Sequence, residues 1–232
     1  MSELERLIQQ HCPNGVPYKA LWELTSWDKK FNAVDRNKQP ITHKYTYYLA
    51  ADLKALERPA GTVKILTTNA TSLYTDEEMV KSTLAEGEVV CIPWGGNPIV
   101  QYYKGKFVTG DNRIATSNDP TVLSNKYLYY CLQSQLPLLA SFYRGSAIQH
   151  PDMAKVLDIR IPVPPIEVQD EIVRILDNFA ELTAELTAEL TARIKQYEYY
   201  RDALLDFTDV CTSGEDIRGG VCSPVEDTRR NW

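Results

Sequence analysis

The residues of this chain that are capable of chemistry do not fall into any common catalytic spacing. The sequence contains no GxxxxGK[ST] phosphate loop, no GxGxxG after a strand, no HExxH and no GxSxG. Asn97-Pro98 lacks the second proline and the aromatic residue of an NPPY-like amino-methylation motif. We therefore predict that the chain is not an enzyme.

The cysteine and histidine residues also give no sign of a metal site or a disulfide framework. The five cysteines are odd in number, none belongs to a CxxC pair, and the three histidines lie far apart in the sequence. His11 and Cys12 are adjacent, and we interpret them as the end of a short helix rather than as a metal site or a catalytic pair. No metal and no cofactor is expected.

The remaining candidates are basic and amide side chains in predicted loops, and their chemistry suits nucleic acid. Forked donors and amides read base edges, whereas Lys, Arg and loop amides hold phosphates. Taken singly, each candidate is explained more simply as a solvated charge, and Trp94 is equally a candidate for the core because Ile92 and Ile99 flank it. The predicted nucleic-acid contacts are Lys29, Lys30, Arg36, Lys38, Trp94, Asn97, Lys104, Lys106, Asn112, Arg113, Arg144, Gln149 and His150.

Charge is divided unevenly along the chain, whose net charge is −6. Residues 1–160 carry 18 Lys and Arg against 16 Asp and Glu, whereas residues 161–232 carry 7 against 15. A nucleic-acid surface is therefore possible only in the N-terminal part, where basic groups can gather on one face. No apolar run approaches the roughly 18 residues that span a membrane, and the N-terminus is charged, so a cytoplasmic protein without a membrane segment is expected.

The elements that must position the candidate residues form a mixed, β-rich domain over residues 1–160. A capping box of Ser2 and Glu5 predicts a short helix that ends before residues 13–15. Residues 125–144 have a helical period with a break at Pro137. The fold class expected is α+β. Strands are predicted at residues 63–66, 89–92, 99–103, 106–109, 113–115 and 156–163, with turns at 93–98, 104–105 and 110–112.

The rest of the chain is organised around residues 161–207, which predict one long helix. The stretch contains no glycine and no proline after Pro165. Starting at Ile172 and moving alternately four and three residues along the chain to Phe207, nine of the eleven positions are apolar or aromatic, as in a coiled coil. These 36 residues extend about 54 Å, which is longer than a domain of this size needs to cover its own core. A partner helix is therefore expected to contact Ile172, Leu176, Phe179, Leu186, Leu190, Tyr197 and Leu204.

A tandem repeat lies inside this helix. Residues 181–184, 185–188 and 189–192 all read ELTA. The repeat length of four residues matches neither the 3.5 residues per turn of a coiled coil nor the 3.6 of a straight α-helix. Each successive leucine is therefore displaced around the helix by about 40°. The block is interpreted as a spacer. Standing alone, it is also explained as a solvated, low-complexity helix made of good helix formers.

Residues 144–177 read RGSAIQHPDMAKVLDIRIPVPPIEVQDEIVRILD. This stretch resembles the specificity subunits of type I restriction-modification systems. The opening residues 7–21, which include CPNGV, are similar to the start of a repeat in that family. The corresponding features are Gly145-Ser146, Ile161-Pro162, Pro164-Pro165, Gln169, Ile172, Leu176-Asp177, the ELTA block and Gln196-Tyr197.

The resemblance implies a non-catalytic subunit in which residues 1–160 recognise double-stranded DNA and residues 161–207 organise partners. The implied partners are methyltransferase subunits, with the restriction subunit as a further candidate. A typical member has two recognition domains and two helices, whereas this chain has one of each. Two copies that pair antiparallel through the helix would carry a domain at each end and read an interrupted palindrome.

Two alternatives remain open on the sequence. The chain is also consistent with a structural coiled-coil assembly protein that makes no DNA contact, or with an inactive remnant of a split gene. Either alternative predicts that residues 1–160 do not bind duplex DNA at low salt. The acidic tail at residues 208–232 lacks periodicity and is expected to be flexible or a scar of truncation.

Overall fold

The computed structural model describes residues 2–206 of the 232-residue chain. It divides into two compact units, Met1–Asn178 and Phe179–Trp232. Phe207, the last position of the predicted helical seam, and the tail predicted to be flexible at residues 208–232 lie outside the described residues.

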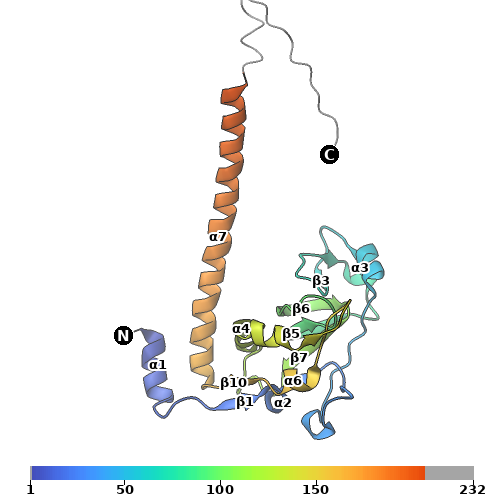
Figure 1. Ribbon diagram of the computed structural model, residues 1–232, viewed down its shortest axis with the longest axis vertical. Coiled ribbons are helices and arrows are strands. Elements are labelled where there is room, and N and C mark those ends of the chain that lie inside the picture. Colours follow the sequence, from blue (N-terminus) through green and yellow to red (C-terminus); the bar gives the residue numbers. More distant parts are fainter. Residues whose placement is uncertain (1, 207–232) are drawn as a thin grey trace, which may run out of the picture. The chain divides into compact units, whose positions relative to one another are not determined.

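A six-stranded sheet forms the centre of the first unit, in the order β2-β7-β5-β6-β3-β4 (Figure 1). Neighbouring strands are antiparallel, except that β3 and β6 run parallel. The strands predicted at residues 63–66 and 89–92 are confirmed. The six strands are β2 (Thr25–Trp27), β3 (Val63–Leu66), β4 (Tyr74–Thr75), β5 (Ala85–Pro93), β6 (Gln101–Thr109) and β7 (Asn112–Ser117).

The strand β6 is one bent strand, whereas the sequence predicted two strands with a turn at residues 104–105. Gln101 Nε2 at its start and the Gly110 N–H just after its end both donate to backbone carbonyl groups of residues 66–67, each at 2.8 Å. A straight strand would hold these two ends about 30 Å apart, so the ladder must curve. Gly105, with a φ of 136°, lies near the middle and permits the bend without a break in the pairing.

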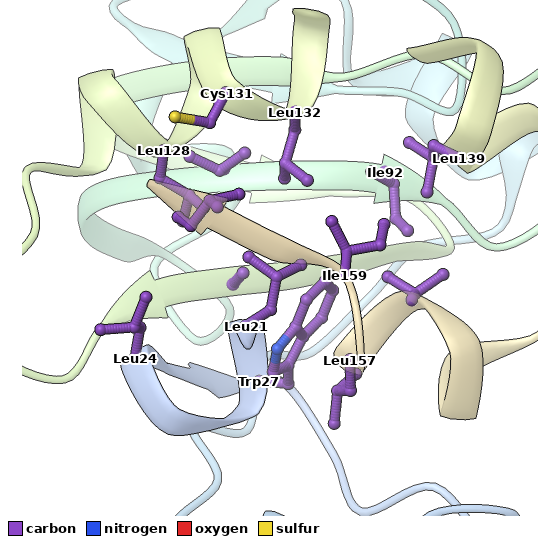
Figure 2. Close-up of a cluster of buried hydrophobic side chains, with 14 of the residues drawn as sticks. Leu21, Leu24, Trp27, Ile92, Leu128, Cys131, Leu132, Leu139, Leu157 and Ile159 are labelled. Atoms are coloured by element: carbon purple, nitrogen blue, oxygen red, sulfur yellow. The ribbon is translucent and has the colours of Figure 1, made fainter. Parts of the chain in front are cut away.

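Side chains of β5 alternate between the two faces of the sheet. Val90 and Ile92 join a large apolar cluster with buried residues of four helices, α2 (Leu21–Leu24), α4 (Asn125–Ser134), α5 (Leu136–Ser141) and α6 (Met153–Leu157). Figure 2 shows this cluster, in which Leu128, Leu132 and Leu139 lie over the sheet. Val89 and Cys91 belong to a second cluster. The period of two in a strand therefore fills a core on each face of β5.

Two predicted elements of the first unit differ from the structure at their boundaries. The predicted helix over residues 125–144 is divided into α4 and α5 around Gln135 and Pro137, as the proline indicated. The predicted strand at residues 156–163 is instead α6 followed by β10 (Arg160–Pro162). A short apolar, β-branched run is compatible with either a buried helix or a strand. Within residues 156–163, only the second half has a strand partner, because β10 pairs antiparallel with β1 (Tyr18–Ala20).

The remaining short elements complete the first unit. The capping box predicted for the first helix is confirmed, since Ser2 and Glu5 bond reciprocally and the helix ends at His11, with Cys12 as its C-cap. These elements are α1 (Glu3–His11), α2 (Leu21–Leu24), the 3₁₀ turns η1 (Arg36–Lys38) and η2 (Glu77–Met79), α3 (Ala50–Leu56), β8 (Tyr143–Arg144) and β9 (His150–Pro151).

The long helix α7 (Ile166–Leu205) begins at Ile166, not at Ile161. Ile161 and Pro162 belong to β10, and Pro164 and Pro165 precede the first turn. The first turns of α7 belong to the first unit. Val168 and Gln169 are buried there, while Ile172 and Val173 pack against the large apolar cluster.

Candidate nucleic-acid interface

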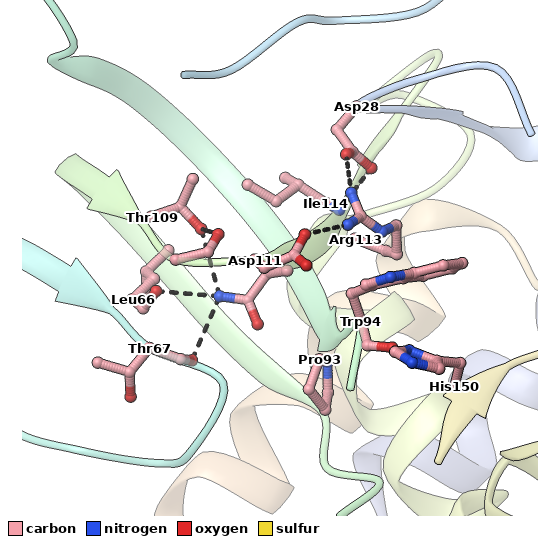
Figure 3. Close-up of polar contacts among 12 residues, drawn as sticks. Asp28, Leu66, Thr67, Pro93, Trp94, Thr109, Asp111, Arg113, Ile114 and His150 are labelled. Atoms are coloured by element: carbon pink, nitrogen blue, oxygen red, sulfur yellow. Dashed lines mark hydrogen bonds and ion pairs between the residues drawn. The ribbon is translucent and has the colours of Figure 1, made fainter. Parts of the chain in front are cut away.

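Trp94, directly after β5, is the centre of a cluster of basic and polar side chains (Figure 3). The Arg113 guanidinium carbon lies 4.7 Å from the centre of the indole ring, and Lys29 Nζ lies 5.3 Å from it. The ring of His150 is 5.1 Å away, between centroids. Three separate segments of the chain therefore meet at one half-buried tryptophan. Arg113 and Lys29 make cation–π contacts with it, and His150 makes a ring–ring contact.

Arg113 is buried beneath this surface. Its side chain is 2% exposed, and it is paired through Nη1 with Asp28 at 2.6 Å and through Nη2 with Asp111. The Asp28 carboxylate also accepts a hydrogen bond from the Ile114 N–H at 3.1 Å. Burial raises the pKa of Asp28 above its ordinary value, and the charge of Arg113 offsets part of this effect.

Asn112 is buried beside Arg113. Its Nδ2 donates to the Leu66 carbonyl oxygen at 3.0 Å and to Thr109 Oγ1 at 3.2 Å. The sequence predicted that Asn112 and Arg113 contact nucleic acid. Both side chains are instead held by protein groups, which argues against direct contact with bases and for a role in shaping the surface.

A small hairpin of β8 and β9 supports the Trp94 loop, residues 94–100, from the side. His150 Nδ1 lies 2.7 Å from the Trp94 carbonyl oxygen, and the Gly96 N–H donates to the Gln149 carbonyl oxygen at 3.1 Å. A carbonyl only accepts, so Nδ1 carries the hydrogen and Nε2 is left for other partners. A Cβ atom at Gly145, where φ is +147°, would lie 2.2 Å from the Ile148 carbonyl oxygen, so this turn needs glycine.

The cluster presents two kinds of exposed groups. Arg144, Gln149 and His150 are exposed on the hairpin, and Asn97 is exposed on the Trp94 loop. Lys29 and Lys30 are exposed beside them, directly after β2. Amide and guanidinium groups suit base edges, whereas the lysines suit phosphates. We call these residues, together with Trp94, the Trp94 surface.

The other predicted contacts are not brought into this cluster. Lys38 pairs with Asp158 at 2.5 Å. On β6, Lys104 and Lys106 pair with acidic residues at 3.5 Å and 2.8 Å. Arg36 is exposed on η1. These ion pairs reduce the positive charge that the three lysines offer to a polyanion.

Sequence reasoning missed a groove of about 520 Å³ next to the Trp94 surface. Asp111 joins the two, because it lines the groove and also pairs with Arg113. The loop between β3 and β4 supplies Thr67, Thr68 and Asn69 to the groove, and Tyr47, 54% exposed, lies on another wall. The available signal was the run TTNATS at residues 67–72, whose uncharged donors and acceptors are not marked by charge.

In the second unit, α7 carries an exposed apolar stripe. Of the predicted partner-facing residues, Ile172 packs on the domain core and Leu176 is half-buried, whereas the others are exposed. Leu182 and Ile194, 50% and 49% exposed, were not predicted but continue the same row at intervals of four. The exposed stripe comprises Phe179, Leu182, Leu186, Leu190, Ile194, Tyr197, Tyr200 and Leu204.

The described residues contain neither a metal-binding cluster nor a helix that could span a membrane. Within residues 2–206, no three His, Cys, Asp or Glu side chains are grouped so as to hold a metal ion. No helix in the same part of the chain has the length and apolar character needed to cross a membrane.

Residues 50–196 match the family described as the type I restriction modification DNA specificity domain. A protein of Haemophilus influenzae assigned as a type I restriction enzyme specificity subunit is 35% identical over 168 residues, which is 66% of this chain and 42% of that protein. A type I restriction enzyme specificity subunit of Escherichia coli is 41% identical over 104 residues, or 42% of this chain and 25% of the relative.

Solved structures agree with the fold. The S subunit of a type I restriction-modification system from M. genitalium superposes with a TM-score of 0.56 at 19% identity, covering 85% of this chain and 48% of that one. The HsdS subunit from Thermoanaerobacter tengcongensis gives a TM-score of 0.50 at 14% identity, covering 88% and 49%. At these identities the similarity concerns the fold, and it confirms the predicted combination of a β-rich sheet with a long helix. The chain spans half or less of each of these proteins.

Proposed function

Because this chain belongs to the type I restriction modification DNA specificity domain family, we propose that it is a non-catalytic subunit that reads one half-site of a DNA target. Residues 1–160 serve as the recognition domain, and the long helix α7 (Ile166–Leu205) serves as the spacer and pairing helix. Catalysis would reside in methyltransferase and restriction subunits that assemble with it in the cytoplasm.

The observation that carries this proposal is the composition of the Trp94 surface. It gathers base-reading and phosphate-binding groups from three segments that are distant in sequence, at one end of the sheet. Arg113 and its two carboxylates fix the position of Trp94 from below. Groups held in advance lose little conformational freedom on binding, which favours a specific contact.

Within this surface we assign different tasks to different residues. Asn97, Gln149 and Arg144 are the proposed base readers, because their side chains are exposed and offer amide or forked donors. Lys29 and Lys30 are the proposed phosphate contacts. The neighbouring groove shares Asp111 with this region and adds Thr68 and Asn69, whose hydroxyl and amide groups also suit base edges.

The exposed stripe on α7 supports pairing with a second copy. The described residues contain one sheet-centred unit and one long helix, and nothing within them covers the stripe. Two copies related by a two-fold axis and paired antiparallel would present two identical domains. The proposed target is therefore an interrupted palindrome, and the proposed complex also docks methyltransferase subunits.

The test is a methylation map of cells that express this chain with its methyltransferase subunit, compared with cells that lack it. We expect a methylated motif with two inverted half-sites that disappears when the gene is deleted. An unchanged map, together with no binding of duplex DNA by the purified chain at low salt, would instead support the alternative of a coiled-coil assembly protein or an inactive remnant.

A further inference from the structure

Gln169, at the end of the first turn of α7, is completely buried where the starts of α4 and α7 meet. Its Oε1 accepts a hydrogen bond from the Ser124 N–H at 3.0 Å, and Ser124 is the N-cap of α4. Its Nε2 donates to the carbonyl oxygens of Val122 and Pro164, both at 2.8 Å. One side chain thus joins the start of α4, the turn before it and the residues leading into α7.

Asp177 provides a second connection between the same two helices. Tyr130 Oη donates to Asp177 Oδ1 at 2.5 Å, and Lys126 Nζ lies 3.2 Å from the same oxygen. Lys126 Nζ is also 4.5 Å from the centre of the Tyr102 ring on β6. This contact therefore continues from α7 through α4 to the sheet.

The two connections lie eight residues apart on α7, which corresponds to about 12 Å along its axis. A helix held at one point can pivot, whereas a helix held at two such points has a fixed direction. Leu128 and Leu132 anchor α4 in the core, and Gln133 Nε2 donates to the carbonyl oxygen of Val100, at the end of the Trp94 loop, at 3.2 Å. Both the proposed DNA surface and the first turns of α7 are therefore attached to α4.

We propose that Gln169 and Asp177 act as a two-point clamp that fixes the direction in which α7 leaves the recognition domain, and so decide which gap between two half-sites the protein accepts. The inference rests on the proposed function, because a gap exists only if two copies read two half-sites. Gln169 and Asp177 are positioning residues, and neither touches DNA.

The chemistry of the buried site explains why glutamine fits it. The site requires one acceptor and two donated hydrogen bonds, which a neutral amide supplies. A glutamate at this position would keep the acceptor but place a carboxylate oxygen against two carbonyl oxygens. A methionine would keep the approximate shape and remove all three hydrogen bonds.

The experiment uses the full chain and the half-site that the wild type selects. Binding is measured to duplexes with one half-site, and to duplexes with two half-sites at the preferred gap and at gaps one base pair shorter and longer. The variants are Gln169→Met, Asp177→Ala, which changes a partly exposed side chain, and Val168→Ala. Val168 is a matched control because it is buried next to Gln169 and its substitution costs packing without removing a hydrogen bond.

We expect the wild type to prefer its gap by about tenfold, and Gln169→Met and Asp177→Ala each to reduce that preference to about threefold or less, with affinity for one half-site nearly unchanged. Val168→Ala should keep the preference. The clamp is overturned if both variants keep the wild-type gap preference. It is also overturned if their affinity for one half-site falls as much as their affinity for two, or if Val168→Ala weakens the gap preference as much as they do. If the wild type itself binds two half-sites no better than one, the proposed function fails and the clamp fails with it.

Discussion

Arg113 illustrates how a residue that suits DNA can be used to build the surface that meets DNA. Its charge is compensated by Asp28 and Asp111, and its planar group lies against Trp94. Removal of one partner from a buried ion pair leaves an uncompensated charge, which is far costlier than replacement of the whole pair.

We therefore predict that Arg113→Ala lowers the free energy of unfolding by about 3 kcal/mol or more, as measured by urea denaturation. Arg113→Met combined with Asp28→Asn should recover part of the lost stability, because residue 28 then no longer carries an unpaired buried carboxylate. A stable Arg113→Ala protein that loses about 1 to 3 kcal/mol of binding only for its cognate site would show that Arg113 reads a base after all.

The exposed residues of the Trp94 surface should separate into two classes. Gln149→Ala should cost about 1 to 3 kcal/mol for the selected site and little for other DNA. Lys29→Ala with Lys30→Ala should weaken binding to all duplexes about equally and reduce the slope of log K against log salt by about 2. Anisotropy titrations at several salt concentrations measure both effects. Equal losses for both proteins on both kinds of DNA would contradict the division into readers and phosphate contacts.

All seven residues of the Trp94 surface are among the predicted nucleic-acid contacts, but local patterns did not predict how they are arranged. His150 meets the Trp94 carbonyl group across 56 positions of sequence, and Arg113 meets Asp28 across 85. Such pairs depend on the curvature of the sheet, which local patterns do not encode. Asn112 and Arg113 follow a turn, where polar residues are usually solvated. Their burial becomes evident only from their partners in the fold, Leu66 on β3 and Asp28 after β2.

At the level of elements, the exposed stripe of α7 differs from a regular heptad seam. The heptad steps reach Thr183 and Arg193, whereas the apolar residues beside them, Leu182 and Ile194, lie in the same row as Leu186 at intervals of four. Thr183 Oγ1 instead donates to the Phe179 carbonyl oxygen within the helix, at 2.7 Å. A row at intervals of four moves around the helix by about 40° per step, so the stripe is inclined across the helix within the repeat.

Charges within this stripe should abolish pairing. We predict that Leu186→Asp with Leu190→Asp gives a monomer, because two carboxylates without partners would have to be buried in the interface. Light scattering coupled to size exclusion measures the mass, with the methyltransferase subunit both absent and present. The matched control is Ala184→Asp with Ala188→Asp, which adds the same charge to the opposite side of the helix. A monomeric wild type under both conditions would contradict symmetric pairing.

Element boundaries show where pattern and structure separate. The first helix and the proline break between α4 and α5 follow from local chemistry, through a capping box and a missing N–H donor. The bend in β6 does not, because Lys104-Gly105 is equally suited to a turn and to a curved strand. The start of α7 was predicted five residues too early, since pairing of β10 with β1 holds Ile161 in a strand.

For the whole molecule, the division of charge agrees with a division of tasks. The 72 residues from 161 onward carry an excess of acidic groups, while the basic residues of the Trp94 surface all precede residue 160. An acidic helix is repelled by DNA phosphates, so it suits protein partners and spacing rather than DNA contact. The chain spans 42% of its Haemophilus influenzae relative.

The ELTA repeat should then set the distance between the half-sites. Residues 181–192 are helical throughout, so each repeat adds about 6 Å of length and about 40° of rotation. Duplex DNA rises about 3.4 Å and turns about 35° per base pair. Two base pairs match the added length but exceed the rotation, whereas one base pair matches the rotation and leaves a small axial misfit. We therefore expect one base pair per repeat.

Deletion of residues 189–192 should shorten the gap in the methylated motif and leave both half-sites unchanged, whereas a fourth ELTA should lengthen it. The measurement is methylome sequencing of cells that express two-, three- and four-repeat versions with the same methyltransferase subunit. A control version with Leu186→Ile keeps the helix length and should keep the gap. The same gap in all three versions would mean that the repeat does not measure distance, and altered half-site bases would mean that the helix contributes to the recognition surface.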